Sequence, residues 1–291
     1  MSLRLDGKVA VVTGAGAGLG RAEAVALAKA GADLVVNDVA DTDVVDELEA
    51  LGAKAVLVRG DVSDSDVARE ITTTAVERLG GLHVLVNNAG VLRDRMLFNM
   101  TDEEWDTVVR VHLRGHFLLS RNAAAYWRNQ AKSSGGTTYG RVVNTSSEAF
   151  LFGSEGQPNY AAAKAGIAAL TVATARGLAR YGVRANAICP RARTAMTAAV
   201  FGVAPPGGVD PLTPDHVAPL VAYLATPAAD HISGQVFVVY GGMVAVLAPP
   251  TVEARFNDPQ WTPQSLDTAL GAYFTGRHPG RMFVATDLMG N

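Results

Sequence analysis

The sequence contains a single cysteine, Cys189, so no disulfide can form within the chain, as is typical of proteins from a reducing compartment. It also lacks a long apolar run. The most apolar late stretch, residues 236–250, is interrupted by Gly241-Gly242 and ends in two prolines, so we expect no membrane span. Residues 1–8 lead directly into a strand-like segment without a signal-peptide pattern. We therefore expect a cytoplasmic protein.

An excess of basic residues is absent as well. The chain has 25 Lys and Arg against 28 Asp and Glu, a formal net charge of −3, which gives no reason to expect nucleic acid as a partner. No internal repeat or low-complexity tract is visible. What the chain has is apolar residues: they make up 48% of its 291 residues, enough for a sizeable core.

Short β-branched runs alternate with Ala- and Leu-rich stretches along most of the chain. We expect strands at residues 9–12, 33–37, 55–59, 84–87, 141–145, 184–188 and 235–239. We expect helices at residues 20–30, 41–51, 64–79, 102–129, 160–181 and 214–226. Several strands are apolar nearly throughout, as parallel strands buried on both faces are. The alternation predicts an α/β protein with a doubly wound parallel sheet.

The chain is expected to form one domain over residues 1–243, followed by an extension over residues 244–291. The extension shows no clear rhythm of strands and helices. We expect it to pack on the same domain or to join a subunit interface. Residues 204–215, rich in Gly and Pro, are expected to form a mobile loop.

A glycine-rich turn follows the first expected strand. The spacing G-x-x-x-G-x-G is met by Gly14, Gly18 and Gly20, whereas the stricter G-x-G-x-x-G pattern fails because Leu19 stands at the third glycine position. Such a turn lets the backbone approach a pyrophosphate at a helix N-terminus. Between a strand and a helix, it indicates dinucleotide binding rather than a plain tight turn.

Asp38 ends the second expected strand, eighteen residues after Gly20. An acidic residue at about this interval binds the ribose hydroxyls of a dinucleotide. Its charge would also repel the ribose phosphate of NADP, by about 1 kcal/mol in water and about 4 kcal/mol at an effective dielectric near 20. We therefore expect NAD as the cofactor. Arg21 could offset part of the repulsion, although its place beside the turn also suits ordinary pyrophosphate contact.

Tyr160 and Lys164 stand four residues apart, and Ser147 lies thirteen residues before Tyr160. On a helix this spacing puts the phenol and the ammonium group on one face. A nearby ammonium favours the phenolate and moves the tyrosine pKa toward neutrality, so the phenol becomes able to act as a base. The Ser147 hydroxyl could hold the substrate oxygen meanwhile. These three are the candidate catalytic residues.

Together these motifs resemble those of the short-chain dehydrogenase/reductase family. The resemblance spans residues 6–243 and rests on Thr13-Gly14-x-x-x-Gly18-x-Gly20, Asp61-Val62, Asn87-Asn88-Ala89-Gly90, Ser147, Tyr160-x-x-x-Lys164 and Asn186-x-Ile188-x-Pro190. It implies a single Rossmann-like domain with seven parallel strands in the order 3-2-1-4-5-6-7. It also implies that Tyr160 is the catalytic acid/base, that Ser147 orients the substrate oxygen, and that Lys164 holds the nicotinamide ribose and lowers the Tyr160 pKa. Members usually form homodimers or homotetramers through the long middle helices.

The resemblance also implies a set of cofactor-binding residues. Asp61 and Val62 would lie beside the adenine, and Ile188 and Thr194 near the nicotinamide carboxamide. The full set is Gly14, Gly18, Leu19, Gly20, Asp38, Asp61, Val62, Asn88, Ala89, Gly90, Tyr160, Lys164, Ile188 and Thr194.

Two residues depart from the family pattern. His112 stands where the family usually has Asn, whose backbone carbonyl supports a water-linked proton relay; a histidine could keep that carbonyl, so we expect activity to be retained. Arg191 stands where the family favours Gly, which changes the substrate loop. Metal binding is not expected, because His112 and His116 lack a third ligand.

The segments around His112 and Asp38 are similar to the (3R)-hydroxyacyl-CoA dehydrogenase unit of peroxisomal multifunctional enzyme type 2. That subgroup oxidises 3-hydroxyacyl-CoA esters with NAD, and related bacterial proteins act on steroid or steroid-side-chain substrates. The resemblance thus implies a small-molecule substrate of lipid metabolism, an acyl-CoA or steroid alcohol. Two alternatives are an NADPH-dependent 3-oxoacyl reductase of fatty-acid synthesis and a catalytically silent cofactor-binding scaffold.

Four arginines, either solvated or facing coenzyme A phosphates, flank the expected cleft: Arg93, Arg95, Arg191 and Arg193.

Overall fold

The computed structural model describes residues 2–276, with residues 199 and 200 described by their backbone alone. The chain divides into two units, the first ending at Val246 and the second beginning at Leu247. The expected boundary at residue 243 moves to 246 because a short last strand pairs with the strand before it, with Met243 opposite Tyr240.

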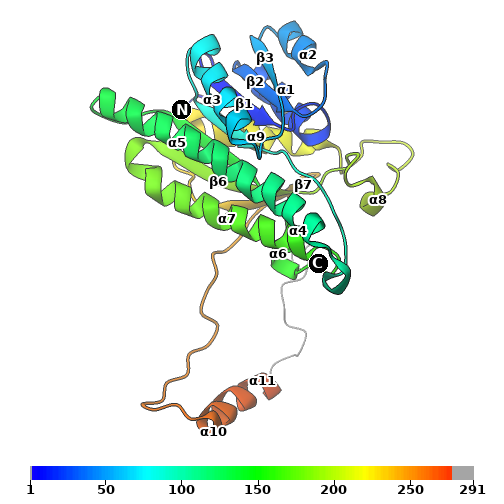
Figure 1. Ribbon diagram of the computed structural model, residues 1–291, viewed down its shortest axis with the longest axis vertical. Helices are drawn as coiled ribbons and strands as arrows, with labels where there is room; N and C mark the ends of the chain where they lie inside the picture. The colour runs from blue at the N-terminus through cyan, green and yellow to red at the C-terminus, as the bar shows by residue number, and fades with distance from the viewer. Residues whose placement is uncertain (1, 277–291) are drawn as a thin grey trace. The chain divides into compact units, whose positions relative to one another are not determined.

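Eight strands form one sheet in the order β3-β2-β1-β4-β5-β6-β7-β8 (Figure 1). The first seven are parallel and confirm the predicted order: β1 (Val9–Thr13), β2 (Asp33–Asp38), β3 (Ala55–Arg59), β4 (Val84–Asn87), β5 (Gly140–Thr145), β6 (Val183–Pro190) and β7 (Val236–Tyr240). The antiparallel β8 (Met243–Val246) was not predicted. Its 4 residues are too few to give a readable pattern, and they follow a turn at Gly241, whose φ is +50°.

Helices cover both faces of the sheet, and each face has its own apolar core. On one face pack α1 (Gly18–Lys29), α2 (Val44–Ala50) and α9 (Ala218–Ala225). On the other pack α3 (Ser65–Leu79), α5 (Gly115–Ser133) and α7 (Pro158–Leu178), with α5 and α7 side by side in Figure 1. Parallel strands buried between two helical layers explain why the expected strands read as nearly continuous apolar runs.

The helix predicted over residues 102–129 is not one regular helix. It begins at Asp102 with α4 (Asp102–Val109), passes through a π-helical turn, η2 (Arg110–Arg114), and continues as α5. Thr101 caps the start, because its hydroxyl accepts the Glu104 N–H while the Glu104 carboxylate accepts the Thr101 N–H. A π-helical turn within an α-helix is often found at functional sites, and this one carries His112.

The remaining helical elements are short. In the first unit they are η1 (Leu97–Asn99), α6 (Ala149–Phe152), η3 (Ala179–Tyr181), α8 (Ala198–Phe201), η4 (Pro214–His216) and η5 (Pro227–Ala229). In the second unit they are α10 (Pro263–Leu266), η6 (Asp267–Gly271) and α11 (Ala272–Gly276).

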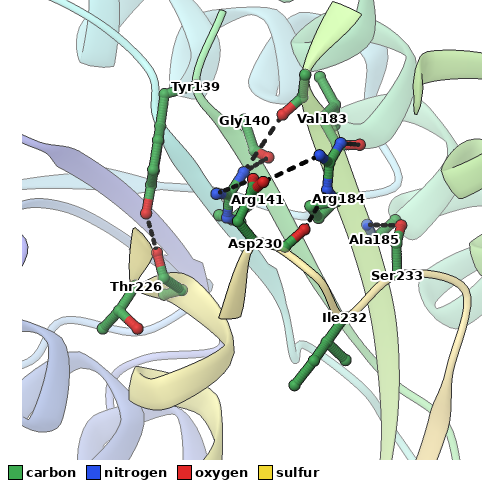
Figure 2. A network of polar contacts seen from close by, with 12 residues as sticks. Tyr139, Gly140, Arg141, Val183, Arg184, Ala185, Thr226, Asp230, Ile232 and Ser233 are labelled. Carbon is green, nitrogen blue, oxygen red and sulfur yellow. Dashed lines mark hydrogen bonds and ion pairs between the residues drawn. The ribbon is translucent and has the colours of Figure 1, made fainter. Parts of the chain in front are cut away.

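A charged network ties together the amino ends of the last parallel strands (Figure 2). Arg141 on β5 and Arg184 on β6 both donate to the Asp230 carboxylate, at 2.9 and 3.2 Å. Arg184 also donates to the Asp230 backbone carbonyl. Because the Arg141 side chain is only 3% exposed, its pairing with an acid is required to keep the charge buried. The network thus lies at the amino ends of the strands, opposite to the edge of the sheet where their carboxyl ends meet.

The second unit has an aromatic contact of its own. Tyr273 lies edge-on to both Phe256 and Phe274, with ring centroids 5.3 and 5.1 Å apart. Residues 277–291 of the predicted extension lie outside the described residues, and the packing expected for the extension stays a prediction. Within residues 2–276 we find no helix with the length and apolar character needed to cross a membrane.

Candidate active site

A cavity of about 440 Å³ opens at the carboxyl ends of the parallel strands. This is the edge at which ligands bind in open α/β sheets. Most of the residues predicted from the sequence line it: Gly14, Gly18, Leu19, Asp38, Asp61, Val62, Asn88, Ala89, Gly90, Tyr160, Lys164 and Thr194. Three predicted residues are not in its wall, namely Ser147, Gly20 and Ile188. We call this space the central cavity.

The glycine turn between β1 and α1 is held by Asn88. The Asn88 amide donates to the carbonyls of Thr13 and Gly14, at 3.0 and 3.2 Å. Gly20 lies just behind this contact, where any Cβ would overlap the Gly14 carbonyl oxygen and crowd the Asn88 amide nitrogen. Gly20 is therefore needed to close the turn, although it does not itself face the central cavity.

Asp38 lies at the end of β2 and lines the central cavity. Its carboxylate accepts the N–H groups of Gly16 and Ala40, at 2.9 and 3.2 Å, which fixes its orientation against the glycine turn. The two nearby arginines already have acidic partners. Arg59, opposite Asp38 on β3, pairs with Asp41, and Arg21 pairs with Asp43 and Glu47.

Asp61 shapes the turn between β3 and α3. Its carboxylate accepts the N–H and O–H of Ser63, at 2.8 and 2.7 Å, and the Arg110 guanidinium, at 2.9 Å. Arg110 belongs to the π-helical turn, so this ion pair joins the wall of the central cavity to the segment that carries His112. The neighbouring Val62 lines the cavity.

Tyr160 and Lys164 lie on α7 and both face the central cavity. Burial raises the pKa of Tyr160 to about 12, while the Ser147 hydroxyl, within hydrogen-bonding reach, acts to lower it. Lys164 donates to the Thr145 carbonyl at 2.6 Å, and its Nζ lies 5.3 Å from the centre of the Tyr160 ring. Burial lowers the pKa of Lys164 to about 7.

These pKa values differ from what the four-residue spacing alone predicts. The spacing predicts an ammonium group that lowers the tyrosine pKa, whereas burial dominates at both groups. Desolvation thus opposes the charged form of each group, the phenolate of Tyr160 and the ammonium of Lys164. The pair acts together only while Lys164 keeps its proton.

His112 occupies the place where the sequence departs from the family pattern. Its ring stands perpendicular to that of Tyr160, with centroids 5.2 Å apart. Its Nε2 lies 3.0 Å from the Val91 nitrogen and 2.8 Å from the Val91 oxygen. Burial, aided by Lys164, holds the pKa of His112 well below its usual range, so the ring is neutral. It thus packs as an uncharged wall of the central cavity.

Gly90 makes room for this histidine. A Cβ at Gly90 would overlap His112 Cε1 and lie 3.0 Å from both ring nitrogens. We expect Gly90→Ala to lower the free energy of unfolding by about 1–3 kcal/mol, as overpacking does. In the double variant with His112→Ala the added methyl group meets no ring, so a double-mutant cycle in urea should give a favourable coupling of about 1 kcal/mol or more. Additive effects of the two substitutions would contradict this packing.

Three of the four arginines flanking the cleft already have partners. Arg95 pairs with Glu104, and Arg193 pairs with Asp210. The Arg191 guanidinium binds both carboxylate oxygens of Glu148, at 2.6 and 2.8 Å, and lies 4.6 Å from the centre of the Tyr240 ring. Since Glu148 directly follows Ser147, the Arg191–Glu148 ion pair joins the segment that carries Ser147 to the end of β6.

Arg93 differs from the other three. It is exposed, and its guanidinium donates only to the carbonyl of the adjacent Leu92. Its own carbonyl accepts the Asn159 amide at 3.0 Å, which holds it beside the residue that precedes Tyr160. Among the arginines flanking the cleft, Arg93 is thus the one whose charge no carboxylate neutralises in the described part of the chain.

The loop after β6 supplies much of the remaining wall. Ile188 is not among the residues that line the central cavity, and its side chain is fully buried in the core that includes α1 and α9. Its predicted place near the nicotinamide stays a prediction. Thr194 does line the central cavity. Sequence reasoning missed its neighbours in the wall, Ala192, Ala195, Met196 and Thr197. Small and apolar side chains in a loop carry no pattern that marks them as functional.

Metal ligands do not gather at the site. Within the described residues, no group of at least three His, Cys, Asp or Glu side chains is placed to hold a metal ion.

Comparisons with known proteins agree with this geometry. A family model of the short chain dehydrogenases matches residues 8–202. The chain is 61% identical to hydroxyacyl-CoA dehydrogenase ChsB1 of Mycobacterium tuberculosis, across 98% of this chain and 94% of that protein. It is 38% identical to peroxisomal multifunctional enzyme type 2 of Mus musculus, across 84% of this chain but only 33% of that longer protein.

A crystal structure of a short chain dehydrogenase from Mycobacterium avium has the same fold. Its TM-score is 0.85 at 43% sequence identity, and the match covers 94% of this chain and 96% of that one. The resemblance seen in the motifs is therefore confirmed. The chain belongs to the short chain dehydrogenase family, and it is an oxidoreductase that acts on CH–OH groups with a nicotinamide cofactor.

Proposed function

We propose that the protein is an NAD-dependent dehydrogenase that oxidises the secondary alcohol of a 3-hydroxyacyl-CoA or of a hydroxysteroid derivative. One observation carries this proposal: Asp38 and the Tyr160–Lys164 pair line the same cavity, with the Ser147 hydroxyl in reach of the phenol. A ribose-binding acid at one end and a proton acceptor at the other are what hydride transfer from an alcohol requires.

The residues of the central cavity fit a dinucleotide. Gly14 and Gly18 line the cavity at or just before the N-terminus of α1 and carry no side chain that would fill it. That helix end suits a pyrophosphate, and the Asp38 carboxylate suits two ribose hydroxyls. Arg21 and Arg59, the arginines near Asp38 in the described part of the chain, already pair with acids, which supports NAD over NADP.

When bound, an oxidised nicotinamide would supply the acceptor for the hydride of the carbinol carbon. In the assigned roles, the Tyr160 phenolate oxygen takes the proton of the substrate hydroxyl as the C–O bond becomes a carbonyl. The Ser147 hydroxyl donates a hydrogen bond to the same substrate oxygen and fixes its position. Lys164, when protonated, stabilises the phenolate. Proton, hydride and electron pair are then all accounted for, and the reverse sequence reduces a ketone.

The character of the cavity supports a lipid-like alcohol. Part of the cavity wall is apolar, where Val91, Ala192, Ala195 and Met196 line it. The similarity to hydroxyacyl-CoA dehydrogenase ChsB1 and to peroxisomal multifunctional enzyme type 2 supports a coenzyme A thioester. Arg93 is exposed and has no acidic partner among the described residues, so we assign it to the phosphates of such a substrate.

We expect Arg93→Ala to raise KM for a 3-hydroxyacyl-CoA by about threefold to tenfold, because an exposed ion pair contributes about 0.2–1 kcal/mol and a charge-assisted phosphate contact somewhat more. The matching pantetheine thioester lacks the nucleotide phosphates, so its KM should not change. Steady-state kinetics with both thioesters measure the effect. Arg69→Ala, on the exposed face of α3, is the control. An equal rise with both thioesters would show that Arg93 does not bind phosphate.

The first alternative, an NADPH-dependent 3-oxoacyl reductase, predicts a clear preference for NADPH and turnover of 3-oxoacyl thioesters in the reductive direction. Turnover with both cofactors separates the two functions. The second alternative is a catalytically silent scaffold, against which the intact Ser147, Tyr160 and Lys164 argue. We also expect a cytoplasmic protein that forms a homodimer or homotetramer through α5 and α7. Light scattering would measure the mass of this assembly.

A further inference from the structure

The chain is held on both sides of Ser147. The residue before it, Ser146, donates its N–H to the Ile188 carbonyl at 2.7 Å and its hydroxyl to the Lys164 carbonyl at 2.8 Å. The residue after it, Glu148, is only 6% exposed, and its carboxylate binds an arginine that follows β6. The place of Ser147 is therefore set by backbone and hydroxyl contacts on one side and by an ion pair on the other.

This ion pair joins Glu148 to Arg191. One carboxylate oxygen lies 2.6 Å from the Arg191 Nε and the other 2.8 Å from an Nη, so the two planar groups meet in a bidentate arrangement. Both side chains are shielded from solvent, with 6% of Glu148 and 17% of Arg191 exposed. The Tyr240 ring packs against the same guanidinium, with its centre 4.6 Å away. A guanidinium held by a carboxylate and by a ring has little freedom to move.

The backbone of Arg191 is fixed as well. Its N–H donates to the Val239 carbonyl at 3.0 Å, which continues the pairing of β6 with β7 beyond Pro190. The residues on either side of it, Pro190 and Ala192, line the central cavity. The ion pair therefore connects the segment that carries Ser147 to the sheet, at the level of the cavity wall.

The turn after Ser147 depends on Glu148. It is the residue from which α6 starts, and its carbonyl accepts the Leu151 N–H at 2.8 Å. The Ser147 hydroxyl oxygen in turn accepts the Ala149 N–H, at 3.2 Å. A helix of 4 residues is marginal by itself, so contacts from outside have to hold it in place. Fixing Glu148 thus fixes the turn whose N–H binds the Ser147 hydroxyl.

Stability alone is a weak reason for a shielded ion pair. The cost of taking two charges out of water offsets most of their attraction, and an apolar pair of similar size often stabilises a fold equally well. What an arginine adds is geometry, because its rigid fork matches a carboxylate in a defined orientation. Here that orientation is imposed on the residue next to Ser147.

We propose that Arg191 and Glu148 are positioning residues for Ser147: their ion pair holds the serine hydroxyl at the place where it meets the substrate oxygen. This inference rests on the proposed role of Ser147 and deepens it. Neither Arg191 nor Glu148 lines the central cavity. They act through Ser147 and not by contact with the cofactor.

Glu148→Gln tests the proposal, because it removes the charge and keeps the size of the side chain. We expect kcat with NAD and a 3-hydroxyacyl-CoA that the parent turns over to fall by about tenfold to a hundredfold, the order of loss that a displacement of about 1 Å causes. The Kd of NAD should not change, because Asp38 and the glycine turn are untouched. Steady-state kinetics and fluorescence titration measure the two quantities.

The decisive measurement repeats this substitution in a Ser147→Ala background. If Glu148 acts by holding the Ser147 hydroxyl, there is nothing left to displace, and kcat of the double variant should equal that of Ser147→Ala. Arg191→Lys keeps the charge but loses one of the two hydrogen bonds, so its loss should be about twofold to tenfold and should vanish in the same background. This variant carries the test if Glu148→Gln fails to fold.

Asp230→Asn is the matched control. It removes the carboxylate from another shielded arginine, Arg141, whose side chain is 3% exposed at the amino ends of the strands. It should lower the melting temperature, as Glu148→Gln also should, but leave kcat unchanged at temperatures where every variant is folded. Loss of an ion pair is thereby separated from loss of Ser147 placement.

Three outcomes would overturn the proposal. Neither Glu148→Gln nor Arg191→Lys lowers kcat in the first. In the second, kcat falls by the same factor with Ser147 present and absent, and in the third, NAD affinity falls together with kcat; both indicate general damage to the cavity. Failure of the proposed mechanism itself would look different, because Ser147→Ala alone would then leave turnover intact.

Discussion

Replacing Tyr160 by phenylalanine is expected to lower kcat by about 10²–10⁴-fold, the usual contribution of a positioned acid or base. The phenyl ring keeps the edge contact with His112 and the packing of α7, and only the hydroxyl that exchanges the substrate proton is lost. The affinity for the cofactor should change little, because Lys164 and the glycine turn remain. Stopped-flow or steady-state turnover of a 3-hydroxyacyl-CoA with NAD measures kcat, and fluorescence titration measures cofactor binding.

A matched control is Tyr223→Phe on α9, on the other face of the sheet. It removes a phenol hydroxyl from the same fold and should leave kcat unchanged. Wild-type turnover in Tyr160→Phe would show that the assigned base is wrong, whatever the substrate. A loss of folding by circular dichroism is not expected.

Replacing Asp38 by asparagine is expected to shift cofactor preference toward NADP by about fivefold to a thousandfold in the ratio of kcat/KM values. That range corresponds to repulsion of about 1 kcal/mol in water and about 4 kcal/mol at an effective dielectric near 20. Asparagine keeps the shape of the carboxylate and can still accept the Gly16 N–H through its carbonyl oxygen. The change therefore isolates the charge. Activity with NAD should fall as well, since a ribose acceptor is weakened.

The control is Asp46→Asn, which removes an exposed acid from α2. It should leave the NAD to NADP ratio as it is. A wild-type enzyme that prefers NADPH, or an Asp38→Asn variant with unchanged preference, would refute the proposed role of Asp38 and favour the reductase alternative.

The two predictions rest on residues that the sequence alone picked out. Tyr160, Lys164 and Asp38 stand at intervals that helix and strand geometry converts directly into shared faces and strand ends. Seven parallel strands were likewise predicted, because strands buried on both faces leave apolar runs bounded by helical stretches. Local periodicity was sufficient wherever an element was long and regular. Periodicity was not sufficient to predict β8, or the π-helical turn η2 between α4 and α5, because each has too few residues to show a pattern.

The tertiary structure decided what each charged group does. The arginines flanking the cleft look alike in sequence, yet Arg191, Arg193 and Arg95 meet carboxylates from distant segments, and only packing leaves Arg93 apart. Ile188 belongs to the core rather than to the cavity wall, because its side chain faces α1 and α9.

The pair of Tyr160 and Lys164 shows the same division most clearly. The sequence determined that a phenol and an amine share one helical face, since that follows from a spacing of four residues. Their pKa values follow from burial, which raises that of Tyr160 and lowers that of Lys164. Spacing fixes which groups meet, but desolvation depends on everything packed around them, and that is known only from the folded protein.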